Sequence, residues 1–227
     1  MATTLAFDVY GTLFDTNGVT AALAKLVGDQ AGEFAKSWRD KQLEYSFRRG
    51  LMRDYVDFGV CTRQALDFVC RSSGVEISEN GKKELMETYR TLPVFNDVKE
   101  GLESLAVDGF RMYAFSNGRA QMVAGLLKNS GIENYFLDVV SVDEIGSFKP
   151  DPEVYKHFLG KTGSLADDSW LVSGNPFDVL GAMAAGMNGL WLQRTPEAVF
   201  DPWGVEPSAT AKALSELAGK IRHHKKG

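Results

Sequence analysis

The sequence predicts an α/β fold in which a parallel sheet is interrupted by an inserted helical subdomain. From residue 94 onward, short apolar runs rich in β-branched and aromatic residues alternate with helical patterns, which is typical of βαβ units. Between about residues 16 and 92 apolar residues instead recur at helical spacing, and no convincing strand is present. The 227 residues, 44% of them hydrophobic, are enough for one domain core with a sizeable insertion.

The expected elements of the sheet follow one another along the chain. Strands are predicted at residues 4–8, 111–116, 138–141, 170–173 and 188–193. Helices are predicted at residues 98–107, 121–128, 153–161 and 179–185. This alternation predicts one α/β core domain made of residues 1–15 and 93–227.

The segment 16–92 is expected to form a cap subdomain of packed helical hairpins. Its first apolar stripe consists of Phe34, Trp38, Leu43 and Phe47, and its second of Val56, Val60, Ala65, Phe68 and Val69. The run Ser72-Ser73-Gly74 indicates a break after the second stripe. An active site is expected where this cap meets the core.

Composition and charge exclude several classes of function. The net charge of -5 and the pI near 5.3 give no electrostatic footprint for nucleic acid. No run of eighteen apolar residues and no basic-then-apolar leader is present, so we expect a cytoplasmic protein without a membrane partner. Cys61 and Cys70 lack CxxC spacing, which predicts buried or idle thiols rather than redox or metal ligands.

A candidate nucleophile follows the first predicted strand. The apolar run Leu5-Ala6-Phe7 leads to Asp8, and Gly11-Thr12 then turns the chain. A carboxylate displayed at a strand end in this way is well placed to attack a substrate carbon or phosphorus atom.

Polar groups follow the other strands too. Ser116 and Asn117 come after a second apolar run, where serine and asparagine are also ordinary turn residues. Lys149 directly precedes a predicted helix that Asp151 can cap. The stretch from Ser173 to Asp178 brings an amide and a lone carboxylate to a helix start, where capping is an alternative role for Ser173, Asn175 and Asp178.

The order and spacing of these motifs over nearly the whole chain resemble the haloacid dehalogenase superfamily, and within it the L-2-haloacid dehalogenases. The resemblance implies a Rossmann-like parallel sheet core with an inserted helical cap. Most members of the superfamily are magnesium-dependent phosphotransferases with a second Asp two residues after the nucleophile, where this chain has Tyr10. A phenol cannot replace a carboxylate around magnesium. With Asn175 at another expected acidic position, this favours the dehalogenase branch, with no metal or cofactor.

The resemblance also implies a role for each site residue. Asp8 is the nucleophile, and the substrate carboxylate is bound by Ser116, Lys149 and the backbone N–H groups around Val9 and Tyr10. Arg39, in the Trp-Arg-x-Lys-Gln pattern of the cap, receives the departing halide together with Asn117 and Phe177. Asp178 positions the water with help from Asn175, Ser173 and Thr12, while Tyr155 matches an active-site tyrosine.

The expected reaction is the hydrolysis of a short L-2-haloalkanoic acid to the D-2-hydroxy acid, with inversion and through an ester on Asp8. The partners are then a small halogenated carboxylic acid and a halide ion, and the resemblance implies a homodimer. Three alternatives stay open. Defluorination or ring opening of another small 2-substituted acid would share the nucleophile, a magnesium-dependent phosphatase would need more acidic ligands, and a silent binding module would not need Asp8, Lys149 and Asp178.

Overall fold

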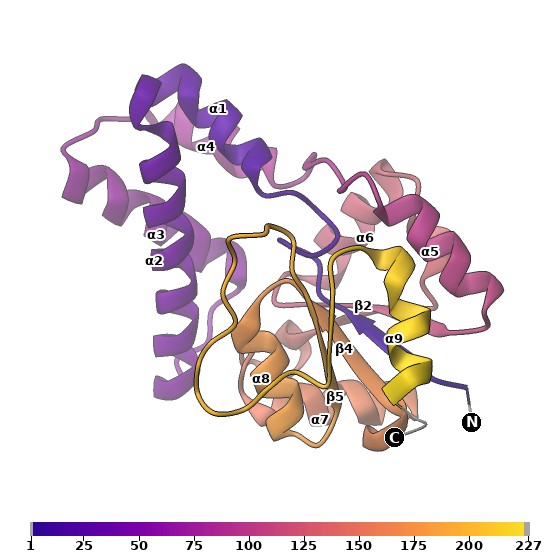
Figure 1. Ribbon diagram of the computed structural model, residues 1–227. Helices are drawn as coiled ribbons and strands as arrows, with labels where there is room; N and C mark the ends of the chain where they lie inside the picture. Colours follow the sequence, from indigo (N-terminus) through magenta and orange to yellow (C-terminus); the bar gives the residue numbers. More distant parts are fainter. Residues whose placement is uncertain (1, 225–227) are drawn as a thin grey trace.

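A parallel sheet with the strand order β3-β2-β1-β4-β5-β6 forms the centre of the computed structural model, which describes residues 2–224 (Figure 1). The strands are β1 (Thr4–Phe7), β2 (Arg111–Ser116), β3 (Val139–Ser141), β4 (Ser169–Ser173), β5 (Asn188–Leu192) and β6 (Ala209–Ala211), and every neighbouring pair is parallel. The predicted α/β class and its five strands are confirmed. The short edge strand β6 was not predicted.

Helices cover both faces of this sheet. They are α5 (Val98–Val107), α6 (Ala120–Asn129), α7 (Pro152–Thr162), α8 (Pro176–Ala184) and α9 (Leu217–His224). Leu5 and Phe7 of β1 belong to the apolar cluster that includes α5, α6 and α9, whereas Ala6 belongs to the cluster that includes α7. Because the central strand is buried on both faces, it appears in the sequence as a continuous apolar run.

Four helices lie together to one side of the sheet (Figure 1). They are α1 (Asn17–Val27), α2 (Ala31–Met52), α3 (Phe58–Ser73) and α4 (Glu79–Thr88). Asp57 caps the start of α3, where its side chain accepts hydrogen bonds from the backbone of Gly59 and Val60, and Gly74 caps its end in the left-handed conformation, as the predicted break indicates. Within residues 2–224, no helix combines the length and apolar composition that a bilayer span requires.

The buried side of α2 differs from the predicted stripe. Phe34 and Trp38 are buried as expected, but the next buried side chains are Gln42 and Ser46, and Leu43 is only partly buried. Trp38 Nε1 donates to the carbonyl oxygen of Thr62 at 2.8 Å, and Gln42 Nε2 donates to Thr62 Oγ1 at 2.5 Å. Hydrogen bonds to α3 therefore allow a polar residue to occupy the stripe. Elsewhere in this group of helices, Cys61 and Cys70 are buried free thiols, as expected.

Candidate active site

Asp8 lies at the carboxyl end of the central strand β1. The chain passes from β1 to β2 and β3 on one side and to β4 and β5 on the other, and such a reversal in strand order is where α/β proteins bind ligands. The backbone N–H of Asp8 donates to the carbonyl oxygen of Val172 on β4 at 3.0 Å. The turn that follows closes on Val9, whose carbonyl oxygen accepts from Leu13 and Phe14, while Gly11 supplies a φ of 80°.

The two oxygens of the Asp8 carboxylate have different surroundings. Its Oδ2 accepts hydrogen bonds from Thr12 Oγ1 at 2.7 Å, Asn175 Nδ2 at 2.8 Å and Ser173 Oγ at 3.4 Å. Its Oδ1 accepts from Lys149 Nζ at 3.2 Å. The side chain as a whole is 7% exposed. One oxygen is thus held by three neutral donors, and the other faces the ammonium group.

Lys149 is buried between two carboxylates in the loop before α7. Its Nζ donates to Asp178 Oδ2 at 2.8 Å, to the carbonyl oxygen of Phe115 at 2.9 Å and to Asp8 Oδ1 at 3.2 Å. An ammonium group has three protons to donate, so these contacts use all of them. Lys149 N donates to Asn117 Oδ1 at 3.0 Å, which ties the loop to the end of β2. This arrangement keeps one cation beside both acids.

Asp178, in the first turn of α8, is completely buried. Its Oδ1 accepts from the hydroxyl of Tyr155 at 2.7 Å, and its Oδ2 from Lys149. Burial raises the pKa of Asp178 above its ordinary value, although Lys149 and the Tyr155 hydroxyl favour the ionised form. Burial and the neighbouring acid raise the pKa of Tyr155 well above its usual value, so Tyr155 stays a donor. A carboxyl group with a raised pKa is suited to accept a proton during a reaction.

The side chain of Asn175 is hydrogen-bonded to Asp8. Its Nδ2 donates to Asp8 Oδ2 and, at 3.2 Å, to the carbonyl oxygen of Tyr10, so two acceptors fix the orientation of the amide. The side chain makes no capping hydrogen bond to α8, and the alternative of a simple cap is wrong for this residue. The amide N–H of Asn175 and the ammonium group of Lys149 point at Asp8, and these nitrogen donors do not form the set of oxygen ligands that magnesium requires.

The predicted halide residues come from different elements and make separate contacts. Arg39 on α2 is partly buried and donates from Nη1 to Gln42 Oε1 at 2.6 Å. Phe177 at the start of α8 packs edge to face against Phe47 of α2, with ring centroids 5.2 Å apart. Asn117 accepts from the backbone of Lys149. Among these residues, Phe177 is the one that brings the core into contact with α2.

Tyr10 faces the same helices. Its ring packs edge to face on Tyr89, with centroids 6.0 Å apart. Burial, then Tyr89 and Asp8, raise the pKa of Tyr10 to about 12, whereas the positive charge of Arg39 opposes the rise. The phenol is therefore neutral at physiological pH, and its surroundings are those of a partly apolar wall rather than of a metal ligand.

A cavity of about 270 Å³ lies against this wall. Tyr10, Gly118 and Met122 line it from the core, and Gln42, Phe58 and Tyr89 line it from the helices. Larger hollows of about 550 and 680 Å³ are lined by residues of α2, α3 and the loop after α3, and include none of the predicted site residues. The cavity of about 270 Å³ therefore adjoins Tyr10, in the turn that follows Asp8.

The remaining predicted residues also lie at this edge of the sheet. Ser116 is buried, and its Oγ accepts from Gly118 N at 3.0 Å, which leaves the hydroxyl proton to be donated. Thr12 and Ser173 contact Asp8, whereas Val9 belongs to the apolar core. Gln42 contacts Arg39 and Arg194 contacts Thr12, although neither Gln42 nor Arg194 was predicted. For Gln42 the helical spacing from Phe34 and Trp38 was an available signal.

Residues 2–186 match the family of haloacid dehalogenase-like hydrolases. Haloacetate dehalogenase H-2 of Moraxella sp. (strain B) is 34% identical over 217 residues, which cover 96% of each chain. (S)-2-haloacid dehalogenase 4A of Burkholderia cepacia is 35% identical, with 95% of this chain and 94% of the relative covered. The structure of the L-2-haloacid dehalogenase from Xanthobacter autotrophicus with chloropropionic acid covalently bound has a TM-score of 0.90 and 29% identity, covering 98% of this chain and 99% of that one. The chain belongs to the haloacid dehalogenase-like hydrolases and, within them, to the L-2-haloacid dehalogenase family.

Proposed function

We propose that the protein hydrolyses short L-2-haloalkanoic acids to D-2-hydroxy acids through an ester on Asp8. The observation that carries the proposal is the asymmetric setting of this carboxylate, with Lys149 at Oδ1 and three neutral donors at Oδ2. Family membership supports the cleavage of a carbon–halogen bond, and the covalently bound chloropropionic acid in the Xanthobacter structure supports a covalent route.

In the first step Asp8 Oδ1 attacks the carbon that bears the halogen. The new oxygen–carbon bond forms on the face opposite the halogen, and the halide leaves with the bonding electron pair, which inverts the configuration. We assign Oδ1 because Oδ2 is held by Thr12, Asn175 and Ser173. Lys149 places a positive charge beside the attacking oxygen.

Binding of the substrate is assigned to both sides of the site. Its carboxylate is held by the Ser116 hydroxyl and the N–H groups of Val9 and Tyr10, to which Lys149 adds its charge rather than a free donor, since its three protons are already shared. The halide is received by Arg39, Asn117 and Phe177, where a guanidinium and a ring edge stabilise the developing anion.

In the second step water attacks the carbonyl carbon of the ester. Asp178 takes the proton from this water, and the negative charge develops on Asp8 Oδ2. The three donors already at Oδ2 are then an oxyanion hole that is formed before the reaction starts. In the collapse of the intermediate the bond to the substrate oxygen breaks, and this oxygen takes the proton held by Asp178 and leaves as the hydroxy acid. Asp8 keeps one oxygen atom from the water, and the second proton of the water is released to the solvent.

Isotope labelling tests this route. The enzyme, in excess, hydrolyses L-2-chloropropionate in heavy-oxygen water for a single turnover, and the peptide that contains Asp8 is weighed. We expect one heavy oxygen in Asp8 and none in the first product molecule. Heavy oxygen that enters the product directly would contradict the ester. An Asp8→Asn variant is the control, and it should release no chloride.

We assign residues 16–92 to a cap that closes over the site, because Phe47 and Tyr89 of this segment contact Phe177 and Tyr10 of the core. A homodimer is proposed as well. Leu51 and Met52 at the end of α2 are 87% and 64% exposed, and burial of such a pair is typical of an interface between copies. Sedimentation of wild type and a Leu51→Glu, Met52→Glu variant tests this, and a monomeric wild type would contradict it.

A further inference from the structure

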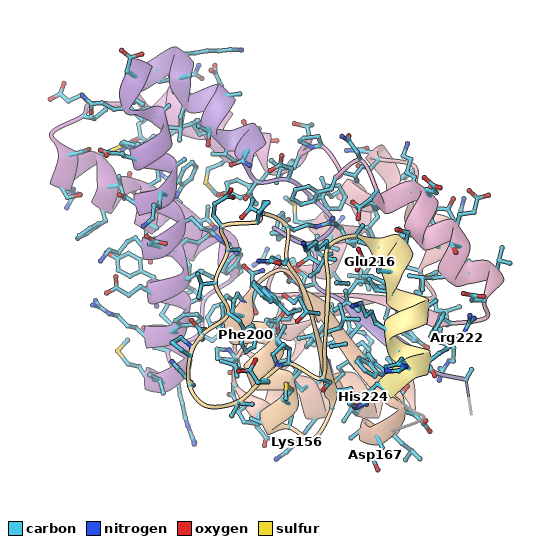
Figure 2. All side chains as sticks on the ribbon, viewed as in Figure 1. Lys156, Asp167, Phe200, Glu216, Arg222 and His224 are labelled. Atoms are coloured by element: carbon cyan, nitrogen blue, oxygen red, sulfur yellow. The ribbon has the colours of Figure 1, made fainter. Side chains whose placement is uncertain are left out.

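Arg194 binds the backbone of the turn that follows Asp8. It lies two residues after β5, at the start of the loop that carries Phe200 (Figure 2). The ring of Phe200 packs against Trp191 of β5. Its Nε and Nη2 donate to the carbonyl oxygen of Thr12, at 2.9 and 2.5 Å. Its side chain is 11% exposed. A mostly buried guanidinium thus holds the backbone of a residue four positions after Asp8.

The other side of this guanidinium binds Asp97. Its Nη1 donates to both carboxylate oxygens of Asp97, at 2.7 and 2.9 Å, and Asp97 Oδ2 also accepts from Leu214 N at 2.8 Å. The ring of Phe95 lies 4.2 Å from the guanidinium carbon. Two distant chain segments, Thr12 and residues 95–97, therefore fix the plane of the Arg194 side chain, and Leu214 holds Asp97 in turn.

Thr12 connects this anchor to the reacting carboxylate. Thr12 is fully buried, and its hydroxyl donates to Asp8 Oδ2 at 2.7 Å while accepting from Gly174 N at 2.9 Å. The direction of the hydroxyl depends on where the Thr12 backbone is held. The backbone carbonyl is the atom that Arg194 binds twice.

We propose that Arg194 is a positioning residue for the chemistry on Asp8, which it serves by holding Thr12 so that the Thr12 hydroxyl is donated to Oδ2. This inference rests on the proposed ester route. Without Arg194 the Thr12 carbonyl loses two hydrogen bonds, the loop can shift, and the charge that develops on Oδ2 loses one of its three donors for part of the time. The effect falls mainly on kcat, because Arg194 binds the carbonyl oxygen of Thr12 and not the Val9 and Tyr10 N–H groups assigned to the substrate.

A double-mutant cycle on kcat tests this inference. Thr12→Val removes the hydroxyl but keeps the carbonyl, and we expect a loss of about 10²-fold, as for other oxyanion donors. Arg194→Met should lower kcat by about 10-fold and leave KM within about 2-fold. If Arg194 acts through the hydroxyl, the double variant has the kcat of Thr12→Val alone. Losses that multiply, or an unchanged kcat in Arg194→Met, would overturn the proposal.

A matched control separates positioning from stability. Arg111 Nη2 also donates to a backbone carbonyl, that of Thr162 at 3.0 Å, but it lies at the amino end of β2, away from Asp8. Arg111→Met should lower the melting temperature and keep kcat. If Arg194→Met does not fold, Arg194→Lys replaces it in the cycle, and partial recovery of kcat is then expected because one donor remains. The heavy-oxygen labelling of Asp8 reports on the ester route separately, so loss of either idea is recognisable.

Discussion

Lys149 Nζ lies 2.8 Å from Asp178 Oδ2, and both side chains are fully buried. The same nitrogen lies 3.2 Å from Asp8 Oδ1, so one cation is shared by the proposed nucleophile and the proposed base. Two acids without this cation would be two uncompensated charges in a buried site, which is strongly unfavourable. The shared cation therefore compensates charge on both acids.

Replacement of this cation should therefore damage both folding and chemistry. For Lys149→Met we expect a loss of about 3–5 kcal/mol in the free energy of unfolding, measured in urea, because one partner of a buried pair is removed. Chloride release from L-2-chloropropionate should fall below detection. Lys156→Met is the control, since Lys156 pairs with Glu153 in an exposed position. Equal behaviour of the two variants would contradict the shared role.

Substitution of the proposed base should stop the reaction at the ester. Asparagine has the shape of aspartate, so Asp178→Asn keeps the packing against Tyr155 but cannot accept a proton from water. We expect about one chloride per active site followed by a slow phase. The Asp8 peptide should then carry the added mass of the acid. A variant that turns over slowly without an adduct would assign the base elsewhere.

The pH dependence of kcat should report on Asp178. Burial raises the pKa of this carboxyl, and ester hydrolysis needs the ionised form, so kcat falls as the pH is lowered through a pKa higher than that of an ordinary aspartate. The Tyr155 hydroxyl favours the ionised form. In Tyr155→Phe the pKa of Asp178 therefore rises further, and the acid limb of the kcat profile moves to higher pH. A shift to lower pH would contradict this assignment.

The sequence predicted that several candidate site residues lie together, because parallel strands bring their carboxyl ends to one edge of the sheet. Asp8 follows β1, and the stretch from Ser173 to Asp178 follows the adjacent strand β4, so their proximity is a consequence of the strand order. Lys149 could be placed only through the resemblance, since the distance from its loop to Asp8 is a property of the folded chain.

Other features depend on contacts that no local pattern carries. The strand β6 is the three residues Ala209–Ala211, too short and too poor in β-branched residues to predict, and it exists because it pairs with β5. Arg194 has no distinctive sequence context, and its role follows from Thr12 and Asp97 in the folded protein. Polar residues that are buried through tertiary hydrogen bonds are a general blind spot of hydrophobic patterning.

Gln42 is a buried residue that links α3 to Arg39, and we expect it to fix the orientation of the Arg39 guanidinium. Its Oε1 accepts from Arg39 Nη1 at 2.6 Å, its Nε2 donates to Thr62 Oγ1 at 2.5 Å, and Thr62 Oγ1 donates to the carbonyl oxygen of Phe58 at 2.8 Å. In Gln42→Leu the guanidinium loses its acceptor and becomes free to turn. If Arg39 receives the halide, inhibition of the enzyme by bromide should weaken by about 10-fold, roughly the effect of one hydrogen bond to a charged group.

Gln64→Leu makes the same change in an exposed pair with Arg49 and should leave bromide inhibition unchanged. Wild-type inhibition in Gln42→Leu would separate Gln42 from halide binding, whereas Arg39→Lys, which keeps the charge but loses the planar fork, would still test Arg39 itself.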